Sequence, residues 1–300
     1  MLRLTTVVVL AACASAPPPV ESPAAAPPKS FAVTVTGHGP PVILIPGLSS
    51  SGETWDSTVA HLRGRYTCHV LTLAGFAGVP PIAGPLLPAV RGELARYITE
   101  RRLDRPVVIG HSLGGALALS FAAEQPTLVG RIVIVDALPF LTGILAGAKT
   151  VDEARPVLEG MRKTLAGQTQ PQYEAFVRSG MQTRSMVRSD ADHARIIAWG
   201  LASDRTTVSN AMLDLLGTDL RPVLPRIAAP SLVIATWAGW GERDGTVETF
   251  RAQYVGLAGT QLVVNDTARH FVMLDEPAWW FAALDRFLEG TAAAVSHRSL

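Results

Sequence analysis

The sequence predicts an α/β protein with a mostly parallel central sheet that is covered by helices on both faces. Short, entirely apolar runs such as residues 42–45 are typical of strands that are buried on both sides. Segments with helical spacing separate these runs, and this alternation of strand and helix favours parallel pairing. The chain has 300 residues, of which 48% are hydrophobic, so it can bury one large core.

The expected strands begin with an edge strand, in which polar and apolar residues alternate. They cover residues 31–36, 42–45, 67–73, 107–109, 131–136, 230–235 and 261–264. One helix is expected to begin near residue 54, a second to run through residue 102 and a third to follow residue 115. Two more are expected at about 247–254 and at 277–288, where the fold ends. Cys68, in the strand at 67–73, is most simply a buried core residue.

Residues 139–222 follow a different pattern, with helical spacing, many Arg, Gln, Ser and Asp residues and no convincing strand. The methionines of this segment and Trp199 have two open roles: they line an acyl pocket, or they form the segment's own small core. Methionine fills irregular gaps well, which favours the second role. The methionines concerned are Met161, Met181, Met186 and Met212.

Composition also divides the chain into segments. Residues 1–29 read as a leader and a Pro/Ala-rich tether, and residues 291–300 as a flexible tail. Residues 30–138 and 223–290 form the two parts of one core, and residues 139–222 form a helical insertion between them. We therefore expect one α/β core with one insertion.

The first residues resemble a bacterial export signal. Arg3 supplies a positive charge, residues 4–12 are apolar, and Leu-Ala-Ala precedes Cys13 as in a lipobox, whose cysteine becomes lipidated and the new N-terminus. In the alternative, an ordinary signal peptide is cut elsewhere and Cys13 is incidental. The favoured interpretation predicts an exported protein, lipid-anchored on the periplasmic side of the bacterial cell envelope.

Charge and composition exclude several classes of partner. The 26 basic and 25 acidic residues give a net charge of +1, which does not favour binding to nucleic acid. No apolar run approaches 18 residues, so contact with a membrane is expected only through a lipid on Cys13. Two cysteines with these separate roles leave neither a disulfide framework nor a metal cluster.

The sequence Gly110-His111-Ser112-Leu113-Gly114 lies between an expected strand and an expected helix and matches the pattern G-x-S-x-G. Side chains two residues before and after Ser112 would clash where strand and helix converge, so glycine is needed there. The turn also places Ser112 at the N-terminus of a helix, whose N–H groups favour a developing negative charge. Ser112 is therefore the predicted nucleophile.

This motif and its context resemble the nucleophile elbow of the α/β-hydrolase family, of the serine esterase and lipase type. The resemblance extends from about residue 31 to residue 290. It implies a helical cap inserted after the strand that the family counts as its sixth, here residues 131–136. It also implies an oxyanion hole made by the N–H groups of Leu48 and Leu113, with Pro46 standing where the family usually has histidine.

A serine nucleophile needs a base, and the base needs an acid to orient it. His270 follows the last expected strand, at the position of the family's catalytic histidine. For the acid, the run from Gly241 to Asp244 matches the family's Gly-x-x-Asp and favours Asp244, although it follows its strand by more residues than usual. Asp136 is the runner-up, because some members use this position, but aspartate is also a common structural turn residue there. His111 is expected to serve in packing or hydrogen bonding.

The resemblance therefore implies a serine hydrolase that cleaves carboxylic esters through an acyl-enzyme, with a small-molecule ester as partner and no cofactor or metal. Lactone hydrolysis, thioester cleavage, acyl transfer and perhydrolysis use the same parts and stay open as alternatives. A non-catalytic receptor that binds a small molecule under the cap is an alternative of another class. The natural substrate depends on how the inserted helices pack, which spacing does not specify.

Overall fold

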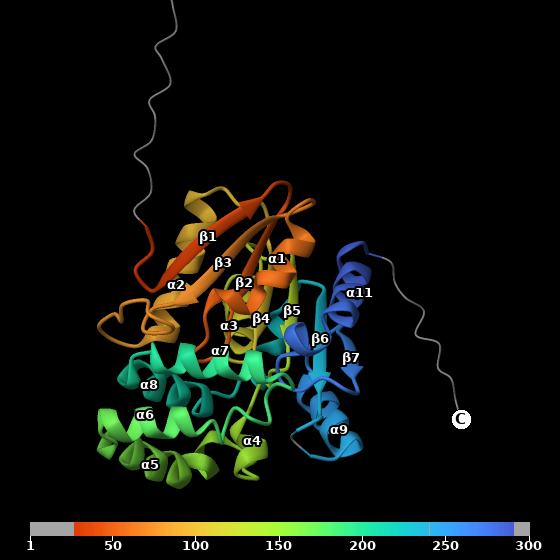
Figure 1. Ribbon diagram of the computed structural model, residues 1–300. Coiled ribbons are helices and arrows are strands. Elements are labelled where there is room, and N and C mark those ends of the chain that lie inside the picture. The colour runs from red at the N-terminus through yellow and green to blue at the C-terminus, as the bar shows by residue number, and fades with distance from the viewer. Residues whose placement is uncertain (1–26, 240, 291–300) are drawn as a thin grey trace, which may run out of the picture.

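The computed structural model describes residues 27–239 and 241–290, which contain one seven-stranded sheet (Figure 1). Its strands are β1 (Phe31–Gly37), β2 (Pro41–Ile45), β3 (Thr67–Leu73), β4 (Val107–His111), β5 (Arg131–Val135), β6 (Ser231–Thr236) and β7 (Gln261–Asn265). The spatial order is β1-β3-β2-β4-β5-β6-β7, in which β1 is antiparallel to β3 and all other neighbours are parallel. The predicted α/β fold class is confirmed.

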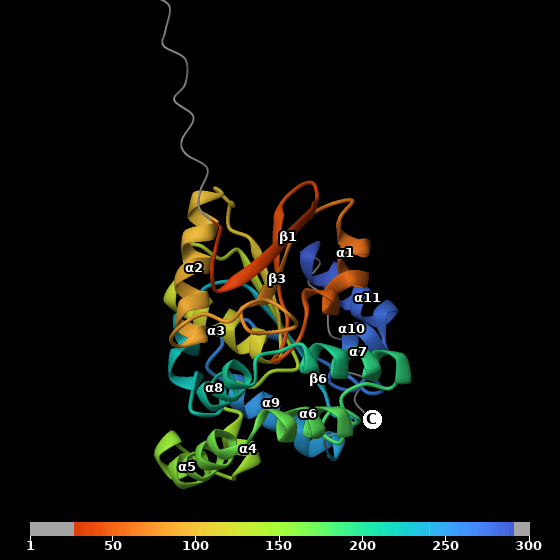
Figure 2. The same cartoon turned by 60° about the vertical axis from the view of Figure 1, so that its left-hand side comes forward.

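Helices cover both faces of the sheet, with α2 and α3 on one side and α1 and α11 on the other (Figure 2). The covering helices are α1 (Asp56–Leu62), α2 (Leu86–Glu100), α3 (Leu113–Glu124), α9 (Arg243–Tyr254) and α11 (Pro277–Leu288). Along β2, Ile43 and Ile45 pack into the core on the α2–α3 side, whereas Val42 and Leu44 pack on the α1–α11 side. All four are fully buried, which explains why this strand is apolar at every position.

Five α-helices lie in the chain between β5 and β6, and we call them the inserted helices. They are α4 (Thr142–Leu145), α5 (Val151–Gly167), α6 (Gln170–Ser179), α7 (Asp190–Leu201) and α8 (Arg205–Leu216). In Figure 1 they lie together below the sheet, at the end where β4 leads into α3. In this chain the insertion follows the fifth strand, β5. The predicted position after a sixth strand therefore holds only when strands are counted as the family counts them.

Short elements complete the described chain. They are the 3-10 helices η1 (Gly52–Trp55) and η2 (Arg221–Arg226) and the helix α10 (Val272–Asp275). Cys68 is free and fully buried, as expected, and burial raises the pKa of its thiol to about 11. None of the described helices has the length and apolarity needed to cross a bilayer.

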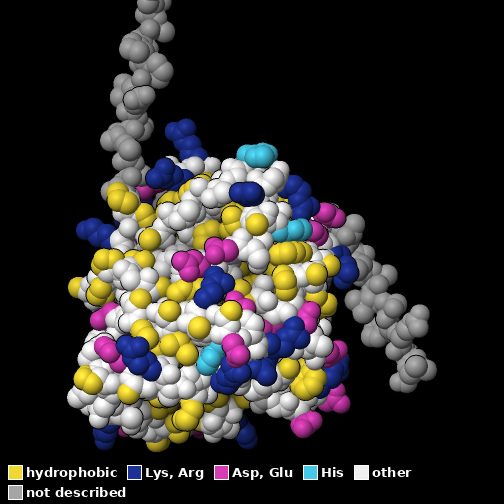
Figure 3. All heavy atoms as spheres, viewed as in Figure 1, with side chains coloured by type: hydrophobic (Ala, Val, Ile, Leu, Met, Phe, Trp, Pro, Cys, Tyr) yellow, Lys and Arg dark blue, Asp and Glu magenta, His cyan; other side chains and the backbone are white. Residues whose placement is uncertain are grey.

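Basic and acidic side chains are interspersed on the face shown in Figure 3, as the near balance of charges leads one to expect. Cys13, the predicted lipidation site, lies outside the described residues, as do the predicted flexible tail at 291–300 and most of the predicted leader. These expectations and the predicted domain boundaries stay predictions.

Candidate active site

Ser112 occupies a sharp turn between β4 and α3. Its φ of 53° and ψ of −119° lie in a region of backbone conformation that residues other than glycine rarely adopt. A Cβ on Gly110 would lie 2.1 Å from the carbonyl oxygen of Gly114, and a Cβ on Gly114 would lie 2.3 Å from that of Ile45. Only glycine fits at either position, so the structure has the strained turn that the sequence pattern predicts.

Two backbone N–H groups accompany the serine. Leu113 is the first residue of α3, so its N–H has no acceptor within the helix. The loop after β2 passes directly beside the turn, since a Cβ on Gly47 would lie 3.3 Å from the Cβ of Ser112. Within the described residues no hydrogen bond takes up the N–H of Leu48, the next residue of that loop. The arrangement is compatible with the two predicted oxyanion donors.

His270 lies against Asp136. Its Nδ1 is 2.5 Å from Oδ2 of Asp136, and the other carboxylate oxygen, Oδ1, accepts a hydrogen bond of 3.0 Å from the backbone N–H of Thr236. The side chains of His270 and Asp136 are only 11% and 6% exposed, so water screens their interaction little. Asp136 directly follows β5 and has a φ of 47°. The carboxylate is thus held between a strand end and the imidazole.

The structure contradicts the expectation that Asp244 is the partner of His270. Asp244 lies in the first turn of α9, its side chain is 97% exposed, and its ion-pair partner is Arg243. The motif match failed because residues 237–243 separate Asp244 from the end of β6 and carry it away from the histidine. Asp136, the runner-up, takes the position.

Two further ionisable side chains lie near this pair and stay neutral. His111 is fully buried, and its Nε2 lies 3.0 Å from the carbonyl oxygen of His270, as expected for a packing and hydrogen-bonding role. Burial, and to a lesser extent the nearby His270, lower the pKa of His111 well below its ordinary value. Tyr254 donates to the carbonyl of Ala137, and burial with the nearby Asp136 charge raises its pKa well above the ordinary value.

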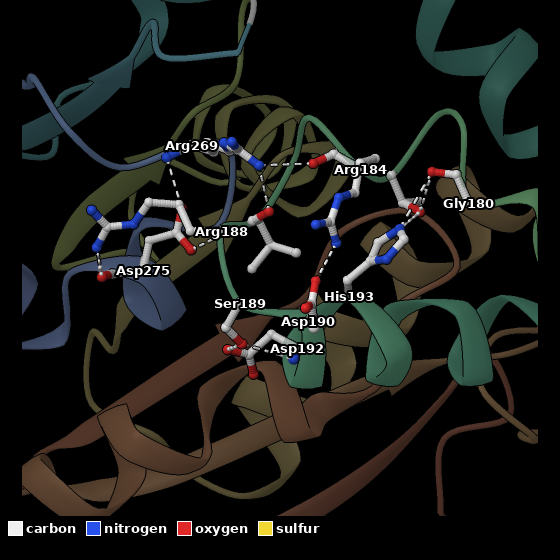
Figure 4. Close-up of polar contacts among 11 residues, drawn as sticks. Gly180, Arg184, Arg188, Ser189, Asp190, Asp192, His193, Arg269 and Asp275 are labelled. Carbon is white, nitrogen blue, oxygen red and sulfur yellow. Dashed lines mark hydrogen bonds and ion pairs between the residues drawn. The ribbon is translucent and has the colours of Figure 1, made fainter.

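The loop that carries His270 is attached to the segment between α6 and α7. In Figure 4 the Arg269 side chain points toward this segment, where its Nη1 donates to the carbonyl oxygens of Arg184 at 2.9 Å and Val187 at 2.8 Å. Phe271 N–H donates to the carbonyl of Met186. The residues before and after His270 are therefore both bound to the inserted part of the chain, a set of contacts that the sequence does not reveal.

Asp275 adds a second link between the same two segments (Figure 4). Its carboxylate accepts from the backbone N–H of Arg269 and from that of Arg188, both at 2.8 Å. The Arg188 side chain also binds the carboxylate of Glu276 at 2.7 Å. Asp275 and Glu276 thus hold the loop at residues 266–271, between β7 and α10, which we call the histidine loop.

The loop after β2 has a similar attachment. Ser49, which follows Leu48, has a φ of 56°. Its hydroxyl donates to that of Ser203, in the turn between α7 and α8, at 2.9 Å. The Ser203 hydroxyl in turn donates to the carbonyl of Trp199 and accepts from the backbone N–H of Ala77. Both loops that flank Ser112 are therefore held by residues outside the sheet.

A cavity of about 680 Å³ brings these parts together, because Leu48, Ser112, Asp136 and His270 all line it. Its volume lies within the usual range for ligand pockets. Leu113 and Asp244 are absent from its lining. The side chain of Leu113 is buried, but an oxyanion donor needs only its backbone N–H.

The two roles left open by the sequence do not account for all of the methionines. Met186 and Met212 line the cavity, whereas Met161 and Met181 do not, and Met181 is largely exposed. Trp199 is buried outside the lining, and its indole N–H donates to the carboxylate of Glu53. Within the described residues no group of three or more His, Cys, Asp or Glu side chains could hold a metal ion.

Residues 42–283 match the model of the Alpha/beta hydrolase family, which is most of the chain. The chain belongs to this family. Among curated relatives it resembles the pimeloyl-[acyl-carrier protein] methyl ester esterases of Stenotrophomonas maltophilia, 29% identical over 268 residues, and Aeromonas hydrophila, 26% identical over 265 residues. These alignments span 87% and 86% of this chain and 98% and 99% of the relatives.

Solved structures of this α/β-hydrolase fold are also similar. The enol-lactonase from Burkholderia xenovorans matches with a TM-score of 0.70 at 17% identity, over 86% of this chain and 96% of that one. The esterase from Exiguobacterium antarcticum matches with a TM-score of 0.70 at 17% identity, over 86% and 95%. At this identity the likeness shows the fold alone.

Proposed function

We propose that this member of the α/β-hydrolase family cleaves carboxylic esters, with Ser112 as nucleophile. The observation that carries the proposal is that the strained elbow serine shares one cavity with a buried histidine–aspartate pair. The names of the curated relatives support it, because a methyl ester esterase cleaves a carboxylic ester. No observation favours the non-catalytic receptor.

The mechanism follows from the orientation of the imidazole. Nδ1 of His270 is bound to Asp136, so Nε2 is the nitrogen that takes the serine proton as Ser112 attacks the ester carbonyl. Asp136 keeps the proton on Nδ1 and stabilises the imidazolium that forms. His270 then gives the proton to the departing alcohol, which leaves an acyl-enzyme. A water molecule then gives a proton to His270 and attacks the carbonyl of the acyl-enzyme. His270 returns this proton to Ser112 as the carboxylic acid leaves.

The oxyanion of each tetrahedral intermediate needs donors beside Ser112. The N–H groups of Leu48 and Leu113 take this role in the proposal, and the N-terminus of α3 adds its dipole. Because the main chain supplies both donors, they are already oriented when the substrate arrives. Removing one such donor in comparable sites costs roughly a hundred- to a thousand-fold in kcat.

The Ser112→Ala variant tests the proposal. It should lower the kcat for p-nitrophenyl butanoate by several orders of magnitude and abolish labelling by a fluorophosphonate, because only the nucleophilic oxygen is lost. Ser120→Ala is the matched control, since Ser120 lies on the same helix and its hydroxyl donates to the exposed Glu124. A Ser112→Ala enzyme that keeps more than about a tenth of the wild-type kcat would refute the assignment.

We also propose, from the sequence alone, that Cys13 is lipidated and anchors the exported protein in the bacterial cell envelope. Two acyl chains bind a membrane far more stably than a single myristoyl chain does. Mass spectrometry of the mature N-terminus should find a modified cysteine at position 13. If Cys13→Ser protein fractionates with membranes as fully as wild type, the anchor lies elsewhere.

A further inference from the structure

The inserted helices line the cavity with apolar side chains. Val208, Met212 and Leu215 are four and three residues apart on α8, so they share one face of that helix, and all three line the cavity. Val177 of α6 and Leu141, next to α4, contribute further apolar surface. A group bound here would exchange water for hydrocarbon on several sides.

Two hydroxyls in this part of the lining, those of Tyr173 and Ser49, already have partners within the protein. The Tyr173 hydroxyl donates to the carbonyl of Gly200 at 3.0 Å, and the Ser49 hydroxyl donates to Ser203. Burial raises the pKa of Tyr173, so it stays neutral. To bind either of these two hydroxyls, a hydroxylated substrate would therefore have to break an existing hydrogen bond, whereas a hydrocarbon would not.

The cavity also lacks a cation. No Lys or Arg of the described chain is among its lining residues, whereas the carboxylates of Asp136 and Glu242 are. Asp136 is already bound to His270 and to the N–H of Thr236. A carboxylate at the far end of an acyl chain would lose its hydration and find no Lys or Arg in the described lining to pair with. The lining thus rejects anionic chains.

Apolar side chains continue to the opening. Ile144 is 45% exposed, Leu145 is 64% exposed and Phe176 is 42% exposed, and all three line the cavity. Exposed apolar side chains that gather at a cavity are typical of a ligand-binding surface. A chain too long for the interior would therefore continue over hydrocarbon.

We propose that the acyl part of the substrate is an uncharged hydrocarbon chain of medium length, received against α6 and α8. The inference rests on the proposed ester hydrolysis and assigns its substrate class. It predicts that activity rises with chain length, by up to about four-fold for each methylene that moves from water into the cavity. It also predicts that a charge at the end of the chain removes the gain.

The first experiment compares kcat/KM for the p-nitrophenyl esters of acetate, butanoate and octanoate with that for the mono-p-nitrophenyl ester of octanedioic acid. Octanoate should exceed acetate at least ten-fold, and it should exceed its ω-carboxylate analogue by about a hundred-fold or more. Equal rates on the octanoate and its ω-carboxylate analogue, or the highest rate on acetate, would overturn the inference.

A charge placed in the cavity sharpens the test. Met212→Arg should raise the preference for the ω-carboxylate ester relative to octanoate by at least about ten-fold, because the new guanidinium pairs with the carboxylate. Asn210→Arg is the matched control, since Asn210 is an exposed residue of the same helix and should leave the ratio unchanged. An unchanged ratio in a folded Met212→Arg protein would overturn the inference.

Binding to Ser112→Ala protein separates this inference from the proposed function. Calorimetry should show that methyl octanoate binds at least ten-fold more tightly than the monomethyl ester of octanedioic acid. If wild type hydrolyses no ester but this preference holds, ester hydrolysis fails and the pocket assignment stands. If esters are hydrolysed but the two ligands bind equally, or neither binds, the pocket assignment fails alone.

Discussion

The turns after β5 and β6 each offer an aspartate near the same end of the sheet, yet only one lies beside the histidine. Asp136 directly follows the last residue of β5 and is nearly buried, whereas Asp244 lies beyond residues 237–243, in the first turn of α9, and is almost fully exposed. The two strands are neighbours and parallel. The difference therefore comes from the turns and not from the sheet.

What places Asp136 is the backbone around it. Its N–H donates to the carbonyl of Ile234 in the neighbouring strand, its φ is positive, and its carboxylate accepts from Thr236 N–H. The position of a residue that directly follows a strand is determined by the sheet. The position of a residue several places further along depends on the conformation of the loop. Closeness to the strand end was the more informative signal, and it outweighs the match of Asp244 to a short motif.

The largest expected effect comes from Asp136→Asn. The amide removes the charge that stabilises the imidazolium and can favour the wrong tautomer of His270, so kcat should fall about a thousand-fold or more. The measurement is steady-state hydrolysis of p-nitrophenyl butanoate, with thermal melts to establish that the protein is folded. A folded Asp136→Asn enzyme with more than about a tenth of wild-type kcat would remove Asp136 from the mechanism.

Local patterns predicted the sheet and the elbow well because backbone sterics act over a few residues. The strand at 67–73 was predicted with the bounds of β3, and the spacing of Gly110 and Gly114 predicted the turn at Ser112. The contacts of Arg269 could not be predicted, because they depend on where the segment between α6 and α7 lies. The cavity lining depends on helix packing in the same way, so periodicity alone left the roles of the methionines open.

An intermediate effect is expected from Arg269→Gln. This variant tests whether the position of His270 depends on the attachment of its loop to the segment between α6 and α7, as the position of Asp136 depends on β5. Losing the donors to Arg184 and Val187 should let His270 shift, and a small misplacement costs about ten- to a hundred-fold in kcat with little change in KM. Arg269→Lys, whose ammonium group can still donate to these carbonyls, should recover part of the loss. If kcat stays at the wild-type level while only the melting temperature falls, Arg269 has a structural role alone.

A small effect is expected from Thr236→Val, which separates the role of the Thr236 backbone N–H from that of its hydroxyl. The Thr236 hydroxyl is buried without a hydrogen-bond partner among the described residues, whereas its N–H holds Asp136. Valine keeps the shape and the N–H, so kcat should stay within about two-fold and stability should rise by about 1 kcal/mol. Chemical denaturation measures the stability. A large loss of kcat would show that the hydroxyl helps to orient the carboxylate.

The smallest effect is expected from Asp244→Asn, and it tests the comparison from the other side. The Asp244 side chain is exposed, among the described residues it pairs only with the neighbouring Arg243, and it does not line the cavity. Exposed ion pairs contribute little to stability, so both the melting temperature and kcat/KM should match wild type across the pH range of activity. Asp136→Asn, assayed beside it, supplies the contrast. If Asp244→Asn lowers kcat by a factor on the order of a hundred or more in a folded protein, the turn after β6 must rearrange to reach His270 during catalysis.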